Sequence, residues 1–379
     1  MNLLACLLIF ATILYLVYSY IFNKEIKVKH IILISLSIMS SIIILCLNME
    51  PPEAFDIYRH FEEMNYIRGS DLNEFAKFLF SKTIPFWLIF EKIMTLISNN
   101  NHVIYLFSIP MTIIPFVYIL IDMKKNNKIT NRQAVISFFI YFSIINTIHM
   151  MSGIRNALAV SILSIGMYLE LFKKKKIGYL FYVIALLMHQ MVILVLVFRV
   201  CSSLLFKIKI KNKIRIGQYL VIMWQIFSKA ILGILKFMLS IIPISILVIY
   251  TNYLSLELNY KIDVDYRIVI PELIQIILLT VMMHMVIKNN EEVDKRILIF
   301  YYLGFFIIGS FSMFNIFTRT RFIFAYFSPF ILSCWNTVNV ESEKRKVQKK
   351  NIIEHVLLLD SIYINVFYIY FMYCNGVFI

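Results

Sequence analysis

Long apolar stretches alternate with short hydrophilic gaps along the whole of this chain. Many of these stretches reach the roughly 20 residues that an α-helix needs to cross the hydrocarbon core of a bilayer. The alternation therefore predicts an all-α, polytopic integral membrane protein with about 12 transmembrane helices. The expected helices are residues 3–22, 31–47, 102–121, 133–151, 154–172, 177–188, 190–206, 230–250, 267–287, 297–316, 322–339 and 352–374.

The stretch 177–206 differs from the others because lysine-rich gaps flank it on both sides, so that it enters and leaves the membrane at the same face. Each arm reaches roughly 22 Å at about 1.5 Å per residue, less than a hydrocarbon core of roughly 30 Å. A hairpin of two short helices is therefore predicted, with its turn near His189 below the outer boundary of the membrane. Backbone at that depth needs protein or water around it, which places His189 at the base of an outward-facing cavity.

Six hydrophilic gaps hold most of the 37 lysines and arginines, and these gaps are 23–30, 122–132, 173–176, 207–215, 288–296 and 341–350. By the positive-inside rule, gaps rich in lysine and arginine face the cytoplasm. Both chain termini and two soluble segments are then expected outside. The larger segment is a large outward-facing loop, 48–101, and the smaller is 251–266. Because most other connections are short, the larger loop is the expected place of function.

The composition agrees with a membrane protein, since 60% of the 379 residues are hydrophobic and 16% are charged. Soluble domains are about 45–50% apolar and about 25% charged. The net charge of +15 comes mostly from the cytoplasmic gaps, so it indicates contact with membrane lipids and does not indicate nucleic acid as a partner. The five cysteines are scattered without metal or redox spacing. We expect one integral membrane domain over residues 1–379.

Four arginines contradict the charge pattern, because the predicted topology places Arg59, Arg155, Arg319 and Arg321 at the outer face. Positive charge kept on the disfavoured side of a membrane usually has an anion to hold. Arg155 lies at the outer end of the fifth helix, just after Met151-Ser152-Gly153, where it either reaches lipid phosphates or clamps a phosphate or pyrophosphate. Arg319 and Arg321 lie between two helices and form either a compact anion site or loop charges that meet lipid head groups.

Acidic, phenolic and imidazole groups accompany these arginines. Residues 56–61, DIYRHF, follow the second helix as either a charged external loop or a set of groups that bind sugar and phosphate. Asp56, Tyr58 and Arg59 are the candidates within it. His189 is either a buried, hydrogen-bonded histidine or a general base, since an imidazole suits proton transfer near neutral pH. No cluster of His, Asp and Glu has the spacing of metal ligands, so neither a metal nor a cofactor is expected.

Three segments resemble the signature of a known family. Residues 153–159, GIRNALA, precede a lysine run and then residues 185–189, ALLMH. This order is similar to the central signature of the EpsG/Wzy family of membrane polysaccharide polymerases. The DIYRHF segment resembles that family's loop after the second helix, and Arg321-Phe322 with Ser328-Pro329-Phe330 resembles its late arginine segment. At Gln190, where the family often has a small residue or serine, the chain departs from the pattern.

The resemblance implies a multi-pass glycosyltransferase of the bacterial cell membrane that acts on oligosaccharide repeat units linked to undecaprenyl pyrophosphate. Such a polymerase moves a growing glycan from that carrier onto the next lipid-linked repeat unit at the outer face, and so makes capsule, exopolysaccharide or O-antigen. A chain-length regulator is a further candidate partner. The implied catalytic residues are Arg155, His189 and Asp56, and the implied substrate-binding residues are Tyr58, Arg59, Arg319 and Arg321.

Two other functions stay open beside this one. An O-antigen ligase-type transferase would use the same lipid-linked donor with a different acceptor. A polysaccharide transporter or flippase would carry out no group transfer, although such proteins tend to have internal repeats and interrupted helices, and the sequence shows no repeat. Another membrane enzyme, such as a sugar acyltransferase, is a third alternative.

Overall fold

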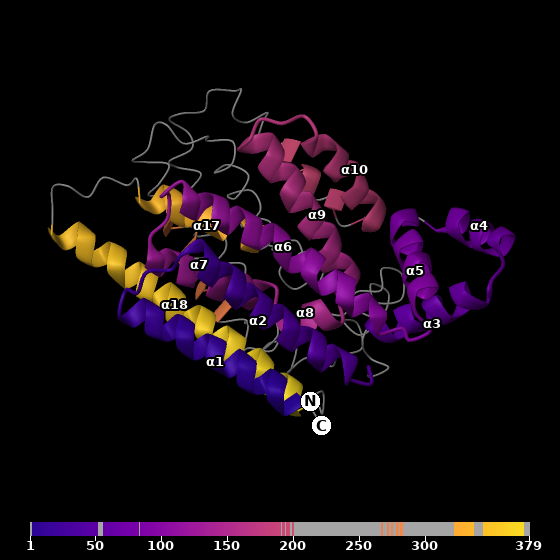
Figure 1. Cartoon of the computed structure of the whole chain (residues 1–379). Coiled ribbons are helices and arrows are strands. Elements are labelled where there is room, and N and C mark those ends of the chain that lie inside the picture. The colour runs from indigo at the N-terminus through magenta and orange to yellow at the C-terminus, as the bar shows by residue number, and fades with distance from the viewer. Residues whose placement is uncertain are drawn as a thin grey trace, which may run out of the picture. The chain divides into compact units, whose positions relative to one another are not determined.

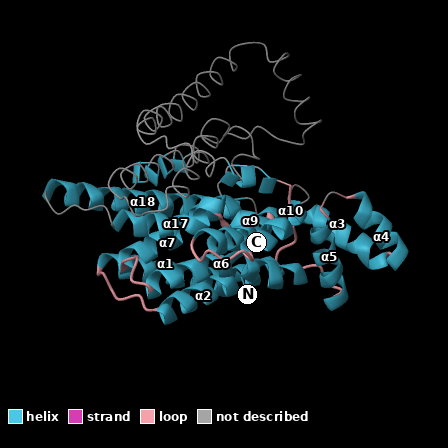
Figure 2. Cartoon of the chain, turned by 90° about the horizontal axis from the view of Figure 1, so that it is seen from above, coloured by secondary structure: helices cyan, strands magenta, loops and turns pink. Residues whose placement is uncertain are grey.

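The computed structural model consists of helices and connecting loops in the part of the chain that it describes (Figure 2). The chain separates into two compact units, of which the first holds residues 1–193, 322–336 and 361–379, and the second holds residues 194–321 and 337–360. The single membrane domain expected from the sequence stays a prediction. The described residues are 2–51, 56–82, 84–190, 192–193, 195–197, 199–200, 267, 271–272, 274–275, 278–279, 281–282, 322–336 and 344–374.

Five of the described helices are long and apolar enough to cross a membrane, so the chain is a multi-pass membrane protein. Each overlaps a helix predicted from the sequence, as do two shorter apolar helices. The long helices are α1 (Asn2–Ile21), α2 (Val28–Leu47), α6 (Val103–Lys125), α9 (Ile154–Leu171) and α18 (Lys344–Cys374), and the shorter ones are α10 (Gly178–Met188) and α17 (Phe322–Asn336). The predicted helices 230–250 and 297–316, with most of 190–206 and 267–287, lie outside the described residues.

The predicted helix 133–151 is instead two helices, α7 (Asn131–Ile144) and α8 (Thr147–Met151). The break falls at Asn146, whose side-chain oxygen accepts a hydrogen bond from the backbone N–H of His149 at 3.0 Å. An asparagine in this role starts a new helix, because it satisfies an N–H that has no partner within the first turn. Hydrophobicity continues through the break, which is why the apolar pattern did not reveal it.

The predicted loop 48–101 is largely helical, with α3 (Asp56–Gly69), α4 (Leu72–Ser81) and α5 (Pro85–Ile97). Local signals start two of these helices. The Asp71 side chain accepts a hydrogen bond from the backbone N–H of Glu74 at 2.7 Å and caps α4. Pro85 occupies the first turn of α5, where its missing N–H costs nothing. The three helices lie together at one end of the first unit (Figure 1).

Hydrogen bonds from polar side chains hold α3 and α5 in place. Arg68 of α3 donates to the Asn101 side-chain oxygen at 2.6 Å, just before α6 begins. Lys92 of α5 donates to the carbonyl oxygen of Ile67 at 2.9 Å, at the C-terminal end of α3. Carbonyls at that end of a helix have no intrahelical partner, and a cation there also meets the negative end of the helix dipole. These hydrogen bonds hold α3 against α5 and against the residues that precede α6.

In the core of the first unit, side chains of other helices donate hydrogen bonds to α6 near a proline. Pro115 has no N–H, so the carbonyl of Met111, four residues earlier, lacks its helical partner. Ser161 of α9 donates its hydroxyl to that carbonyl at 2.7 Å. One residue further on, the hydroxyl of Tyr326 in α17 donates to the carbonyl of Thr112 at 2.9 Å. α9 and α17, from distant parts of the chain, therefore both contact α6 at the turn before Pro115.

The α9–α10 pair confirms the first arm of the predicted hairpin. A Cβ atom on Gly166 would lie 2.8 Å from the carbonyl oxygen of Gly178, so the two helices approach where glycine leaves room. The connecting turn is fixed by Lys173, whose ammonium lies 2.8 Å from the Asp122 carboxylate of α6. α10 ends at Met188, and most of the predicted second arm, 190–206, lies outside the described residues.

Candidate functional site

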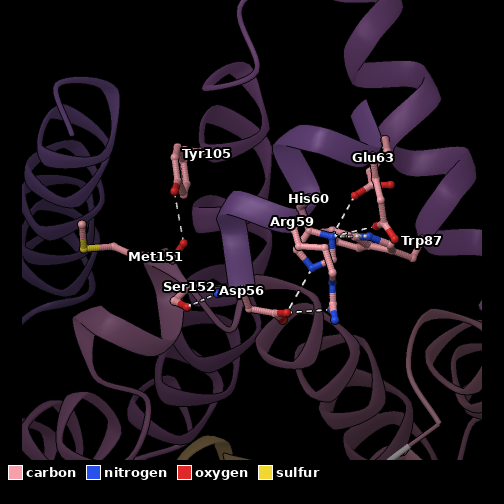
Figure 3. A network of polar contacts seen from close by, with 9 residues as sticks. Asp56, Arg59, His60, Glu63, Trp87, Tyr105, Met151 and Ser152 are labelled. Carbon is pink, nitrogen blue, oxygen red and sulfur yellow. Dashed lines mark hydrogen bonds and ion pairs between the residues drawn. The ribbon is translucent and has the colours of Figure 1, made fainter. Parts of the chain in front are cut away.

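The DIYRHF segment forms the first turns of α3, and helical spacing gathers its polar side chains. Arg59, His60 and Glu63 come three, four and seven residues after Asp56, so their side chains lie on the same side of the helix as that carboxylate. An Arg59 guanidinium nitrogen lies 2.6 Å from one Asp56 oxygen, and His60 Nε2 lies 3.6 Å from the other. Figure 3 shows both contacts on the same side of α3. Asp56 is thus held between a guanidinium and an imidazole.

The buried face of α5 supplies the opposite side of the site. Glu91 Oε1 lies 3.0 Å from His60 Nδ1, and Glu63 Oε2 lies 3.2 Å from the same nitrogen. The indole N–H of Trp87, one helical turn before Glu91, also points at Nδ1 from 3.2 Å (Figure 3). The side chains of His60 and Glu91 are both 0% exposed. Three polar groups therefore converge on one buried ring nitrogen.

A backbone hydrogen bond joins the start of α3 to the segment that precedes α9. The backbone N–H of Asp56 donates to the Ser152 hydroxyl at 3.0 Å. The carbonyl of the neighbouring Met151 accepts a hydrogen bond from Tyr105 of α6 at 3.1 Å, as Figure 3 shows. Ser152 lies three residues before Arg155. The DIYRHF segment therefore lies next to the start of the GIRNALA segment in the fold.

Arg155 lies beside this cluster without being neutralised by it. Its Nε is buried and has no hydrogen-bond partner within the described part of the chain. Nor does any described carboxylate lie within 4.0 Å of its guanidinium nitrogens. Burial would raise the pKa of the Asp56 carboxyl, but contacts with His60 and the charges of Arg59 and Arg155 hold that pKa well below its usual range. Asp56 is thus ionised at neutral pH, while Arg155 retains donors for another anion.

In the buried part of the cluster, ionisable side chains lie close enough to shift one another's pKa. Burial would lower the pKa of His60, but its contacts with Asp56, Glu63 and Glu91 raise that pKa to about 10. Burial raises the pKa of Glu91, and the charge of the neighbouring Glu63 adds to the increase. Carboxylates that share a small buried space must be balanced by positive charge. His60 supplies that charge when it is protonated.

The structure brings together three of the residues predicted from the sequence, namely Asp56, Arg59 and Arg155. Tyr58 lies on the same helix and is half-buried. His189 ends α10, where its backbone N–H donates to the carbonyl of Ala185 at 3.0 Å. α10 packs against both α9 and α5, so His189 directly follows a helix that borders the cluster. Chemical roles for all five residues stay predictions.

The remaining predicted residues, Arg319 and Arg321, lie outside the described residues. The structure in turn adds groups that the sequence analysis did not single out. His60, Glu63 and Glu91 offer ligand atoms that all lie within 4.8 Å of one another, which is compatible with a metal ion. The spacing of His60 and Glu63 on α3 was readable, but their partner comes from another helix.

Comparison with known proteins assigns the chain to a family. None of the curated proteins matches this chain, and none of the solved structures does. A family model described as the EpsG family matches residues 55–378. The matched range contains the whole cluster on α3, α5 and α9 as well as His189. The chain therefore belongs to the EpsG family.

Proposed function

We propose that this protein is a membrane glycosyltransferase that polymerises oligosaccharide repeat units linked to undecaprenyl pyrophosphate. Its family is linked to exopolysaccharide synthesis. The observation that carries the proposal is Arg155, a partly buried guanidinium with an unsatisfied Nε next to the ionised Asp56. A cation kept in that condition fits a phosphate-bearing substrate better than a purely structural role.

The proposed reaction needs positive charge beside the pyrophosphate that leaves. The bond between the anomeric carbon of the growing glycan and its pyrophosphate carrier breaks, and that carbon bonds to a hydroxyl oxygen of the next lipid-linked unit. The hydroxyl proton is released, and the carrier leaves with the bonding electron pair. Arg155 stabilises the negative charge that builds up on the pyrophosphate, and one well-placed donor of this kind is worth about 2.7–4 kcal/mol. Arg319 and Arg321 are candidates for the same pyrophosphate.

The other site residues have roles on the sugar side of the reaction. Asp56, ionised and held between Arg59 and His60, accepts a hydrogen bond from a sugar hydroxyl and orients it. Tyr58, on the same helix, binds sugar. His189 is the candidate base for the proton that the attacking hydroxyl loses. By the positive-inside rule the reaction takes place at the outer face of a bacterial cell membrane.

The test is deletion of the gene, followed by gel and mass analysis of lipid-linked and surface glycans. A polymerase predicts single repeat units in place of a polymer ladder, restored by the wild-type gene. Polymer stranded on the carrier would favour the ligase, and repeat units trapped at the inner face would favour a transporter. An unchanged ladder would rule out all three activities for this protein.

Arg155 is tested in the same strain by complementation. Arg155→Ala should leave protein in the membrane and lower polymer formation by about 10²-fold or more. Arg155→Lys should rescue little, because an ammonium cannot form the paired hydrogen bonds that a guanidinium makes with phosphate. Lys125→Ala, which removes an exposed charge at the end of α6, is the matched control. Wild-type chain lengths with Arg155→Ala would refute the assigned role.

A further inference from the structure

Three ligand atoms of the cluster have the mutual spacing of a metal site. Glu91 Oε1 and Glu63 Oε2 lie 3.0 Å and 3.2 Å from His60 Nδ1. All three atoms lie within 4.8 Å of one another. Adjacent ligands of an octahedral ion, each about 2.1 Å from the metal at right angles, are about 3.0 Å apart. The two short distances therefore match neighbouring corners of one coordination shell.

The hydrogen atoms available to His60 Nδ1 do not satisfy all of its neighbours. If Nδ1 carries a proton, that proton serves one of the two carboxylates, and the N–H of Trp87, 3.2 Å away, finds no lone pair there. If Nδ1 has no proton, it accepts from Trp87, but two carboxylate oxygens then face its lone pair with nothing between them. A cation bound to all three ligand atoms removes the second conflict, because it lies between the lone pairs that would otherwise face one another.

A second observation, independent of the spacing, also points to a missing positive charge. Glu91 is 0% exposed, and neither of its carboxylate oxygens has a hydrogen-bond partner within the described residues. Among the described residues, the only cationic group within 4.0 Å of the Glu91 carboxylate is the His60 imidazole, at 3.0 Å, and it carries charge only when protonated. A buried carboxylate with unsatisfied oxygens is costly unless a cation or a metal compensates it. The unsatisfied carboxylate belongs to the same group of atoms that has the metal-ligand spacing.

A carboxylate faces the far side of the imidazole at ion-pair distance, slightly beyond the range of a hydrogen bond. His60 Nε2 faces Asp56 Oδ2 at 3.6 Å (Figure 3). Histidine ligands usually bind the metal through one nitrogen and donate the N–H of the other to a carboxylate, which fixes the ring and strengthens the ligand. Arg59 holds Asp56 in turn at 2.6 Å. Asp56 thus becomes a positioning residue for the ligand as well as a neighbour of Arg155.

We propose that His60, Glu63 and Glu91 bind a divalent transition-metal cation. One imidazole and two carboxylates favour Mn²⁺ or a similar ion over Mg²⁺ and Ca²⁺, which prefer sites made of oxygen alone. The proposal rests on these side chains and stands independently of the polymerase proposal. Because the site adjoins Arg59 and Arg155 through Asp56, the cation adds positive charge next to the expected place of a pyrophosphate.

The full-length protein in detergent, stripped with EDTA and titrated with Mn²⁺, tests the proposal. Electron paramagnetic resonance measures the free ion, and we expect one Mn²⁺ bound per chain. Glu91→Gln, which keeps the shape and removes one charged ligand, should weaken binding at least about tenfold. Glu62→Gln removes an exposed carboxylate from the same helix and should leave binding unchanged. Wild-type protein that binds no more Mn²⁺ than Glu91→Gln would overturn the proposal.

A stability measurement and a comparison with the gene deletion separate the metal-site proposal from the polymerase proposal. Mn²⁺ should raise the thermal unfolding midpoint of the wild-type protein and not that of Glu91→Gln. If Glu91→Gln does not fold, Glu63→Gln, at a half-buried position, replaces it in the titration. If the purified protein binds Mn²⁺ but deletion of its gene leaves the polymer ladder unchanged, the metal site is supported and the polymerase proposal is refuted. If the deletion strain loses its polymer but the purified protein binds no Mn²⁺, the polymerase proposal is supported and the metal site is refuted.

Discussion

The contact between His60 and Glu91 supports a quantitative prediction about stability in metal-free protein. The two side chains are fully buried, come from different helices and approach to 3.0 Å. His60→Leu removes the group on which Glu63, Glu91 and Asp56 converge, and leaves the Glu91 carboxylate buried without its cation. Glu91→Leu removes that carboxylate while His60 keeps two acidic neighbours. The two single variants should therefore behave very differently.

The expected energies follow from the geometry. Unit charges 3.0 Å apart attract by about 5.5 kcal/mol at an effective dielectric constant of about 20. Loss of one partner of a buried pair typically costs about 3–5 kcal/mol, which we expect for His60→Leu. Glu91→Leu should change the free energy of unfolding by less than about 1 kcal/mol, because an apolar side chain replaces a poorly satisfied carboxylate. The double variant should be at least about 2 kcal/mol more stable than His60→Leu alone.

The assay is reversible unfolding of the four proteins in mixed detergent micelles with increasing SDS, in the presence of EDTA. The quantity of interest is the coupling free energy between the two positions in a double-mutant cycle. Strictly additive free energies, or a double variant no more stable than His60→Leu, would show that the two side chains do not interact in the folded protein. The placement of Glu91 in the site would then be wrong.

Two other predictions concern the scaffold. Gly166→Ala should lower the free energy of unfolding by about 1–3 kcal/mol, because the new methyl group would meet the Gly178 carbonyl at 2.8 Å, whereas Gly69→Ala, with nothing within 4 Å, is the control. Unfolding in the same micelles measures both, and an equal effect would contradict the close packing of α9 and α10. Ser152→Ala should cost about 1 kcal/mol and shorten the polymer by loosening Asp56, while Ser152→Thr, which keeps the hydroxyl, should retain function. Normal polymer from Ser152→Ala would mean that the hydrogen bond does not position Asp56.

The membrane helices and several candidate residues could be predicted from local sequence features. Hydrophobic length and the positions of lysines are properties of consecutive residues, so α1, α2, α6, α9 and α10 could be predicted to within a few positions. The same local logic singled out Arg155, since a cation at a disfavoured end of a helix is visible without knowing its neighbours. Family membership was likewise readable from short segments, and the match over residues 55–378 confirms it.

The surroundings of those residues depend on how the helices pack in the fold. The break at Asn146 depends on one side-chain hydrogen bond inside an unbroken apolar run. Glu91 appeared to be a charge in a surface segment, yet α5 turns it inward against His60 of α3. Burial and a partner on another helix arise from packing between elements distant in the sequence, and no local pattern encodes them. Arg155 could therefore be predicted as a residue, whereas the carboxylate and imidazole cluster beside it required the fold.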